Sequence, residues 1–175
     1  MMNKKTKALV YIGVAEPTPL GPIWVAVNER GLAAVYTHDD KNAFVEELTA
    51  RHRAAVILDE QRTEVYTRQI QEFLAGERES FDLPIDWSVM TPFQEKALKA
   101  TCEVPRGETC TYGEIAAQVG NPKAARAVGR AEATNPIPIV IPCHRVISSD
   151  GKLHGYSGHG GLETKAWLLA LEAWG

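Results

Sequence analysis

The chain has 175 residues, of which 45% are hydrophobic and 23% are charged, a balance typical of a globular protein and not of a disordered or fibrous one. No apolar run approaches the ~20 residues that span a bilayer, and the start of the chain lacks the apolar stretch and cleavage pattern of a signal peptide. We therefore expect a cytoplasmic protein (nuclear in a eukaryote) with no membrane association.

The net charge of −3 is unevenly distributed along the chain. Residues 1–88 carry 10 basic and 14 acidic side chains, whereas residues 89–175 carry 9 and 8. Between residues 121 and 145 a single acidic residue, Glu132, stands against four basic ones, which are Lys123, Arg126, Arg130 and Arg145. This local excess suits phosphate groups, and a solvated helix face explains it equally well.

The three cysteines, at positions 102, 110 and 143, are an odd number and form no CxxC pair. A disulfide framework needs an even set and a zinc ribbon needs paired cysteines, so the pattern indicates neither. We expect each cysteine to be a free thiol in a reducing compartment.

The first half of the chain predicts a small α/β unit. Two strands joined by a hairpin turn are followed by two helices, at residues 23–27, 32–36, 41–52 and 61–74. Gly76 is placed to end the second of these helices. No motif here indicates chemistry, and we expect His38 and His52 to lie on the surface.

The second half is predicted to be mostly helical, with a domain boundary near residue 88. Thr91 and Pro92 suit the cap and first turn of a helix over 93–104, in which Cys102 is expected to be a core residue. The Thr111-to-Glu114 spacing predicts a capping box at the start of a helix over 112–119.

A tight turn then predicts a helix-turn-helix. Asn121 and Pro122 suit the cap and first position of a second helix over 123–133, which is rich in alanine and glycine. Small residues allow close backbone approach, either by another helix or by a DNA groove. A last helix is predicted over 162–174.

The stretch Pro142-Cys143-His144-Arg145 interrupts a hydrophobic run that would otherwise read as a buried strand. A reactive cysteine needs a neighbour that takes its proton, and the imidazole of His144 suits that role. Adjacent residues of a strand point to opposite faces, so either Pro142 bends the chain or a water bridges the two side chains. Glu172, on the leucine-lined side of the last helix, is a candidate partner that orients the imidazole.

Cys143 has three other interpretations. A packed core thiol would not require the polar neighbours His144 and Arg145. A metal site with His144, His154 and His159 matches no standard zinc spacing. A Cys-His-Glu set also serves cysteine hydrolases, and the local residues alone leave acyl and alkyl transfer equally open.

From Thr91 to its C-terminus the chain resembles the O6-alkylguanine-DNA alkyltransferases, also called methylated-DNA–protein-cysteine methyltransferases. The resemblance rests on TPFQEKAL, VPRGET, TYGEIA, NPKAARAVG, NPIPIVIPCHRVI, GYSG and KAWLLALE. In the first half, PLGPIWVAVNERGL is similar to the N-terminal domain of that family. The resemblance implies a ribonuclease H-like α/β domain over residues 1–88. It implies a mostly α-helical DNA-binding domain with a winged helix-turn-helix over residues 89–175.

The resemblance also implies roles for individual residues. Cys143 would accept the alkyl group from guanine O6 as a stable thioether, so that each molecule acts once. His144 would take the thiol proton through a water while Glu172 holds the imidazole. Tyr112 would donate a proton to the leaving purine, and Asn135 would tie the helix-turn-helix to the active-site segment. The substrate pocket would be formed by Lys165, Ser157, Tyr156, Pro138 and Val146.

The implied partner is double-stranded DNA bearing alkylated guanine, bound by a monomer without a cofactor or a metal. The target base must leave the duplex, and Arg126 would fill the space it vacates. The small-residue helix would lie in the minor groove. The implied DNA contacts are Arg126, Ala125, Ala127, Gly129, Thr111, Lys123 and Arg130.

Two rival functions compete with this one. An alkyltransferase-like protein that only binds lesions would lack the acceptor cysteine, whereas Cys143 is present here. A cysteine hydrolase would not need Arg126 or the small-residue helix. The sequence leaves open whether O4-alkylthymine is also a substrate.

Overall fold

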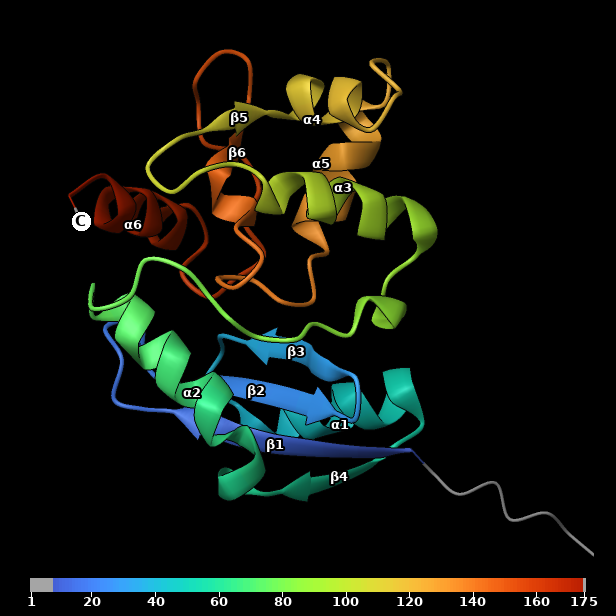
Figure 1. Cartoon of the computed structure of the whole chain (residues 1–175), viewed down its shortest axis with the longest axis vertical. Coiled ribbons are helices and arrows are strands. Elements are labelled where there is room, and N and C mark those ends of the chain that lie inside the picture. The colour runs from blue at the N-terminus through green and yellow to red at the C-terminus, as the bar shows by residue number, and fades with distance from the viewer. Residues whose placement is uncertain (1–7, 175) are drawn as a thin grey trace, which may run out of the picture.

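The computed structural model describes residues 8–174, which form two domains stacked one above the other (Figure 1). The N-terminal domain has a four-stranded sheet in the order β3-β2-β1-β4. Its strands are β1 (Leu9–Ala15), β2 (Ile23–Asn28), β3 (Gly31–Tyr36) and β4 (Ala55–Leu58). The β1–β2 and β2–β3 pairs are antiparallel and the β1–β4 pair is parallel, so the sheet is mixed.

One helix packs on each face of this sheet. On one face, α1 (Lys41–His52) buries Phe44 and Leu48 against Val10 and Ile12 of β1. On the other face, α2 (Glu60–Leu74) contributes to a larger core that β2 and β3 share with the C-terminal domain. The predicted hairpin and both helices are confirmed to within one residue. Gly76 follows α2 with φ of 77°, a left-handed conformation that favours glycine at a helix end.

The segment between the domains runs along the outer edge of β3. The amide of Leu32 donates to the carbonyl of Pro84 at 2.8 Å, and the amide of Asp86 donates to the carbonyl of Leu32 at 2.9 Å. A short 3-10 helix, η1 (Trp87–Val89), follows. The linker therefore occupies hydrogen-bonding groups that a free sheet edge would expose.

The C-terminal domain contains four helices among the described residues. They are α3 (Pro92–Cys102), α4 (Tyr112–Gln118), α5 (Ala125–Ala133) and α6 (Gly161–Trp174). A parallel pair of short strands, β5 (Cys110–Thr111) and β6 (Val146–Ile147), lies beside α4. The expected caps are confirmed: Thr91 accepts from the amide of Gln94, and Thr111 and Glu114 form the capping box.

Two helix boundaries predicted in this domain need correction. α3 ends at Cys102, two residues early, because Pro105 disfavours the helical conformation of the residue before it. α5 begins at Ala125 because the amide of Ala124 donates to the carbonyl of Asn121 at 2.9 Å and closes a turn, so Asn121 caps no helix.

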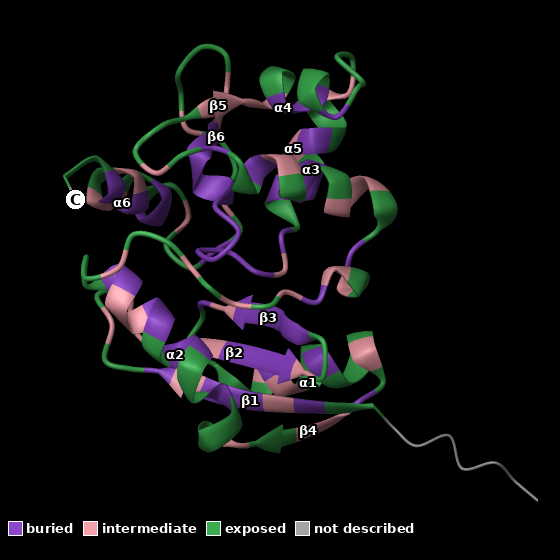
Figure 2. Cartoon of the chain, viewed as in Figure 1, coloured by how far each residue is buried: buried purple, intermediate pink, exposed green. Residues whose placement is uncertain are grey.

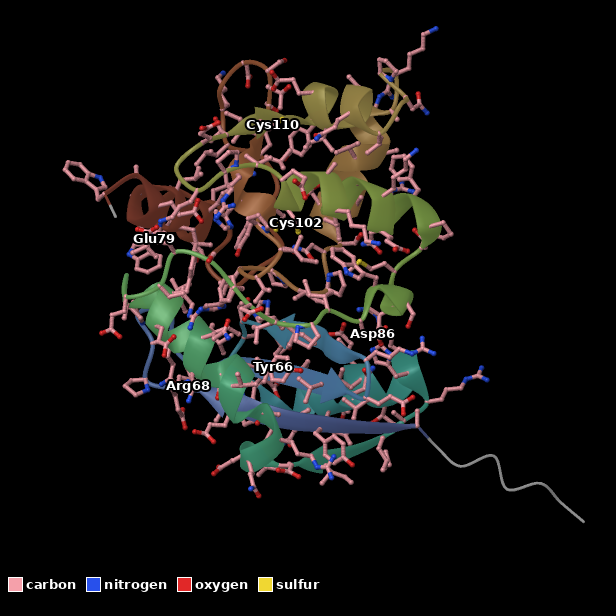
Figure 3. The ribbon with its side chains drawn as sticks, in the orientation of Figure 1. Tyr66, Arg68, Glu79, Asp86, Cys102 and Cys110 are labelled. Atoms are coloured by element: carbon pink, nitrogen blue, oxygen red, sulfur yellow. The ribbon has the colours of Figure 1, made fainter. Side chains whose placement is uncertain are left out.

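Cys102 is exposed and not a core residue, since the buried face of α3 passes through Ala97, Leu98 and Thr101 (Figure 3). His52, predicted on the surface, is half-buried at the end of α1. Burial, and then the neighbouring Arg51, lower the pKa of its imidazole.

The two domains share one core. Leu98, Ile137, Ile141 and Leu168 of the C-terminal domain pack with residues of β2, β3 and α2. The amide of Val35 in β3 donates to the carbonyl of Pro136 at 2.9 Å, and the buried stretch between α5 and α6 lies against the sheet (Figure 2). The N-terminal domain therefore supports the segment that leads into Cys143. Within residues 8–174, no helix has the length and apolar character needed to cross a membrane.

Candidate active site

Cys143, His144 and Arg145 form a single 3-10 turn, η2 (Cys143–Arg145), which packs against α3 and α6 of the C-terminal domain. The amide of Arg145 donates to the carbonyl of Pro142 at 2.9 Å. The bend expected at Pro142 is therefore present, and the strand geometry that would separate the Cys143 and His144 side chains does not apply. All three side chains of the turn are buried.

Glu172 on α6 holds both His144 and Arg145. His144 Nε2 lies 2.7 Å from Glu172 Oε1, and Arg145 donates from Nε to Oε2 and from Nη2 to Oε1, each at 2.9 Å. The remaining Arg145 nitrogen, Nη1, donates to the carbonyl of Val104 at 2.7 Å. Fork-to-carboxylate bonding of this kind is among the strongest in proteins, so the carboxylate is rigidly placed.

These contacts determine the protonation of the pair. Burial lowers the pKa of His144 despite the opposing effect of Glu172, so the imidazole is neutral at rest. Burial opposes ionisation of Glu172, but the hydrogen bonds from His144 and Arg145 outweigh it and lower its pKa to about 2. Nε2 then carries the proton that is donated to the carboxylate, and Nδ1 is a free base. Within residues 8–174, Nδ1 has no hydrogen-bond partner.

Cys143 is a protonated thiol in this resting structure. Burial, and then the nearby Glu132, raise its pKa to about 12, while Asn135 and Lys165 act in the opposite direction. The thiolate is the nucleophilic form, so a base must remove the proton as the sulfur reacts. A neutral imidazole in the same turn is such a base.

Asn135 fixes the segment that precedes the turn. Its Nδ2 donates to the carbonyl of Ile141 at 3.0 Å, and its Oδ1 accepts from the amide of Ile137 at 2.9 Å. Between them, Ile139 has φ of 74°, a conformation that is costly for a β-branched residue. The strained turn is held by buried hydrogen bonds and by the core that the two domains share.

Three side chains on other elements, Lys165, Tyr112 and Tyr156, interact electrostatically with the Cys143 thiol. Lys165 is fully buried, and its Nζ donates to the carbonyls of Val146 at 2.7 Å and His154 at 3.0 Å. Tyr112 also donates to the carbonyl of His154, at 3.3 Å. The hydroxyl of Tyr156 is buried without a partner in the described part of the chain, and burial and Cys143 raise its pKa.

The other three residues expected to form the pocket lie in different environments. Pro138 is buried in the strained turn, and Val146 is buried in a core cluster with Val104 and Ile115. Val146 therefore contributes to the site through its carbonyl group, which accepts from Lys165, and not through its side chain. Ser157 is exposed in the loop before α6.

The surface of α5 carries the residues expected to touch DNA. A pocket of about 530 Å³ lies between α5, the start of α4 and the 148–155 loop, and Tyr112, Arg126 and Gly129 line it. A second pocket, of about 480 Å³, lies between α5 and α3, and Arg126 lines it too. Arg126 therefore stands between two hollows, exposed to solvent.

The remaining residues of this surface are also accessible. Lys123, Ala127 and Arg130 are exposed, and Ala125 is half-buried. Thr111 is also half-buried, and its hydroxyl is already used by the capping box. Among the residues that the structure describes, no three His, Cys, Asp or Glu side chains gather to hold a metal ion.

Comparison with known proteins shows which family this chain belongs to. Residues 10–87 match the family model of the 6-O-methylguanine DNA methyltransferase ribonuclease-like domain, and residues 92–174 match that of its DNA binding domain. A methylated-DNA–protein-cysteine methyltransferase of Methanosarcina barkeri is 42% identical over 167 residues, which cover 93% of this chain and 97% of that one. The chain belongs to the O6-methylguanine-DNA methyltransferase family.

Other members of this family are similar over the same length. The constitutive enzyme of Bacillus subtilis is 40% identical, over 93% of this chain and 94% of that one. The crystal structure of the Mycobacterium tuberculosis O6-methylguanine methyltransferase has a TM-score of 0.77 at 36% identity, over 94% of this chain and 93% of that one. A structure of the mycobacterial protein in complex with DNA gives the same TM-score and identity.

Two features of this family member were not found by sequence reasoning. The role of Arg145, which pairs with Glu172, depends on a contact between residues 27 positions apart. The buried contact of Glu132 with Thr101 joins α5 to α3. No sequence signal singled out Thr101, and Glu132 appeared only as the lone acidic residue of a basic segment.

Proposed function

We propose that this protein repairs DNA by moving an alkyl group from O6 of guanine to Cys143, once per molecule. The observation that carries the proposal is the Cys143-His144-Glu172 arrangement in a member of this family. Sγ forms a bond to the alkyl carbon as the bond from that carbon to O6 breaks. The thiol proton passes through a water to Nδ1 of His144, and Glu172 stabilises the imidazolium.

The leaving guanine accumulates charge at the same time, and Tyr112 is proposed to donate a proton to the purine. Lys165, Tyr156 and Pro138 are proposed to form the pocket, with the carbonyl of Val146 holding Lys165 in place. Ser157 belongs to the same pocket in this proposal if the loop that carries it closes on the substrate. The thioether product has no easy leaving group, so the reaction is irreversible and stoichiometric.

The division of labour is proposed to follow the two domains. Residues 1–88 support the site, and residues 89–175 bind double-stranded DNA as a monomer and carry the chemistry. The basic and small residues of α5 would lie along the DNA, with Lys123 and Arg130 near phosphates. Phosphate contacts release counterions, so we expect affinity to fall as salt rises.

The test is one incubation with a duplex that contains O6-methylguanine, followed by mass spectrometry of the intact protein and its peptides. We expect the mass of one methyl group on the peptide of Cys143, saturating at one per chain. A duplex with O4-methylthymine shows whether that base is also accepted. Binding without any added mass would contradict the proposal and favour a lesion-binding protein.

Arg126→Ala should slow methyl transfer from duplex DNA about ten- to a hundredfold, because the flipped base leaves a gap in the stack at a cost of a few kcal/mol. The rate with the free O6-methylguanine base, which needs no flipping, should not change. Single-turnover rates on both substrates check this.

Lys123→Ala is the matched control for Arg126→Ala, since it removes an exposed cation from the turn just before α5. It should weaken binding and lower the salt slope by about one, with the transfer rate at saturation unchanged. If Arg126→Ala slowed transfer from duplex DNA and from the free base equally, Arg126 would act on the active site itself and not on the duplex.

A further inference from the structure

Glu132 is a buried carboxyl group in the middle of the C-terminal domain, and the proposed mechanism does not use it. It lies on the inner face of α5 with 3% of its surface exposed. Its Oε1 is 2.6 Å from the hydroxyl oxygen of Thr101 on α3. Its Oε2 is buried and has no hydrogen-bond partner within residues 8–174. Glu172, by contrast, has three donors on its two oxygens.

The hydrogen atoms available in this contact indicate a neutral acid. Thr101 is fully buried, and its Oγ1 also lies 3.1 Å from the carbonyl of Ala97. A hydroxyl has one proton, which Thr101 must share between Glu132 and the carbonyl of Ala97, so Glu132 has at most one donor on its two buried oxygens. A protonated Glu132 also explains Oε2, because a neutral carbonyl oxygen is far less costly to bury unpaired than a carboxylate oxygen.

The titratable groups that interact electrostatically with Glu132 include members of α3 and α4, the helices that pack against α5. They are Cys102 of α3, Cys110 of β5, Tyr112 of α4, Cys143 of η2 and Lys165 of α6. Lys165, the cation of this set, and the Thr101 hydroxyl favour the ionised form of Glu132. Burial outweighs both and raises the pKa of Glu132 to about 7. An ionised Glu132 in turn disfavours the thiolate of Cys143.

We infer that Glu132 is a positioning residue that tunes the nucleophile: alkyl transfer is fastest while Glu132 is protonated, and its ionisation slows attack by Cys143. When Glu132 loses its proton to solvent, a negative charge appears in the buried, low-dielectric interior that also holds the developing thiolate. The sulfur then becomes harder to deprotonate. Compared with a variant that is uncharged at position 132, the wild-type protein should therefore transfer the alkyl group more slowly as the pH rises above neutral.

The inference rests on the proposed function, and Glu132→Gln tests it because glutamine has the same shape and no charge. The ratio of the single-turnover methyl-transfer rates, variant over wild type, should be near one at pH 6. It should rise severalfold by pH 8.5, where Glu132 is ionised in the wild type. Glu103→Gln, which removes an exposed carboxylate at the end of α3, is the matched control and should give a ratio of one throughout.

A second measurement is independent of the reaction. Carboxyl resonances of protein labelled at glutamate should include one that titrates near pH 7 and is missing in Glu132→Gln. A flat rate ratio, or a Glu132 resonance that titrates at the ordinary value of 4.5, would overturn the inference. If the wild type transfers no methyl group, the proposed function fails, while the resonance still decides the protonation of Glu132.

Discussion

Cys143→Ser should abolish methyl transfer from an O6-methylguanine duplex while leaving the fold and DNA binding intact. A serine hydroxyl is far less acidic than a thiol and far less nucleophilic, and burial opposes its ionisation even more strongly than it opposes that of Cys143. The substitution also removes little volume from the turn. Peptide mass spectrometry should find no methyl group at position 143, and circular dichroism should match the wild type.

Cys102→Ser and Cys110→Ser are the controls for that result. Cys102 is exposed and Cys110 is half-buried on β5, and the proposal assigns neither a part in the reaction. Each variant should still accept one methyl group per chain. A methyl group on another cysteine of the Cys143→Ser protein would show that the acceptor has been misassigned.

Glu172→Gln should lower both the stability of the protein and its rate of methyl transfer, with an effect on transfer smaller only than that of Cys143→Ser. Glutamine keeps the shape but removes the charge that pairs with Arg145, and an unpaired buried guanidinium is costly. We expect the free energy of unfolding to fall by about 3–5 kcal/mol. The neutral amide also cannot stabilise the imidazolium of His144, so methyl transfer should slow by about a hundredfold or more.

The pH dependence of stability gives a second measure of the same carboxylate. Its pKa is about 2 in the folded protein and 4.5 as an ordinary side chain, so the folded state binds fewer protons between these values. The stability that Glu172 contributes, about 3 kcal/mol, is therefore complete above pH 4.5 and lost as the pH falls toward 2. Glu172→Gln should lack this loss.

Urea unfolding at several pH values measures both effects. Glu163→Gln, on the exposed side of the first turn of α6, is the matched control and should behave as the wild type. A Glu172→Gln protein as stable as the wild type at pH 7 would show that the buried network contributes no net stability.

Local patterns in the sequence determined most of the elements and the main site residues. Thr91 and Thr111 were recognisable caps because a side-chain oxygen three residues before a free amide is a local arrangement. The Pro-Cys-His-Arg stretch indicated a reactive thiol because its chemistry lies in adjacent residues. Glu172 could be proposed because the helical repeat placed it on the leucine-lined side of α6.

The tertiary structure decided what depends on contacts between distant segments. Asn121 looked like a helix cap, but the turn that links α4 to α5 uses its carbonyl group and delays the helix to Ala125. Cys102 looked buried by its spacing from Leu98, yet α3 ends there and the residue is exposed.

The protonation states of buried side chains are also decided by the tertiary structure, because they depend on which groups surround each side chain in the core. Glu132 and Glu172 are chemically identical in the sequence, and both are buried. Arg145 and His144 lower the pKa of Glu172, whereas Glu132 meets a single hydroxyl and its pKa rises. The sequence by itself determined which residues could react, and packing between α3, α5, α6 and the sheet decided which of them carry charge.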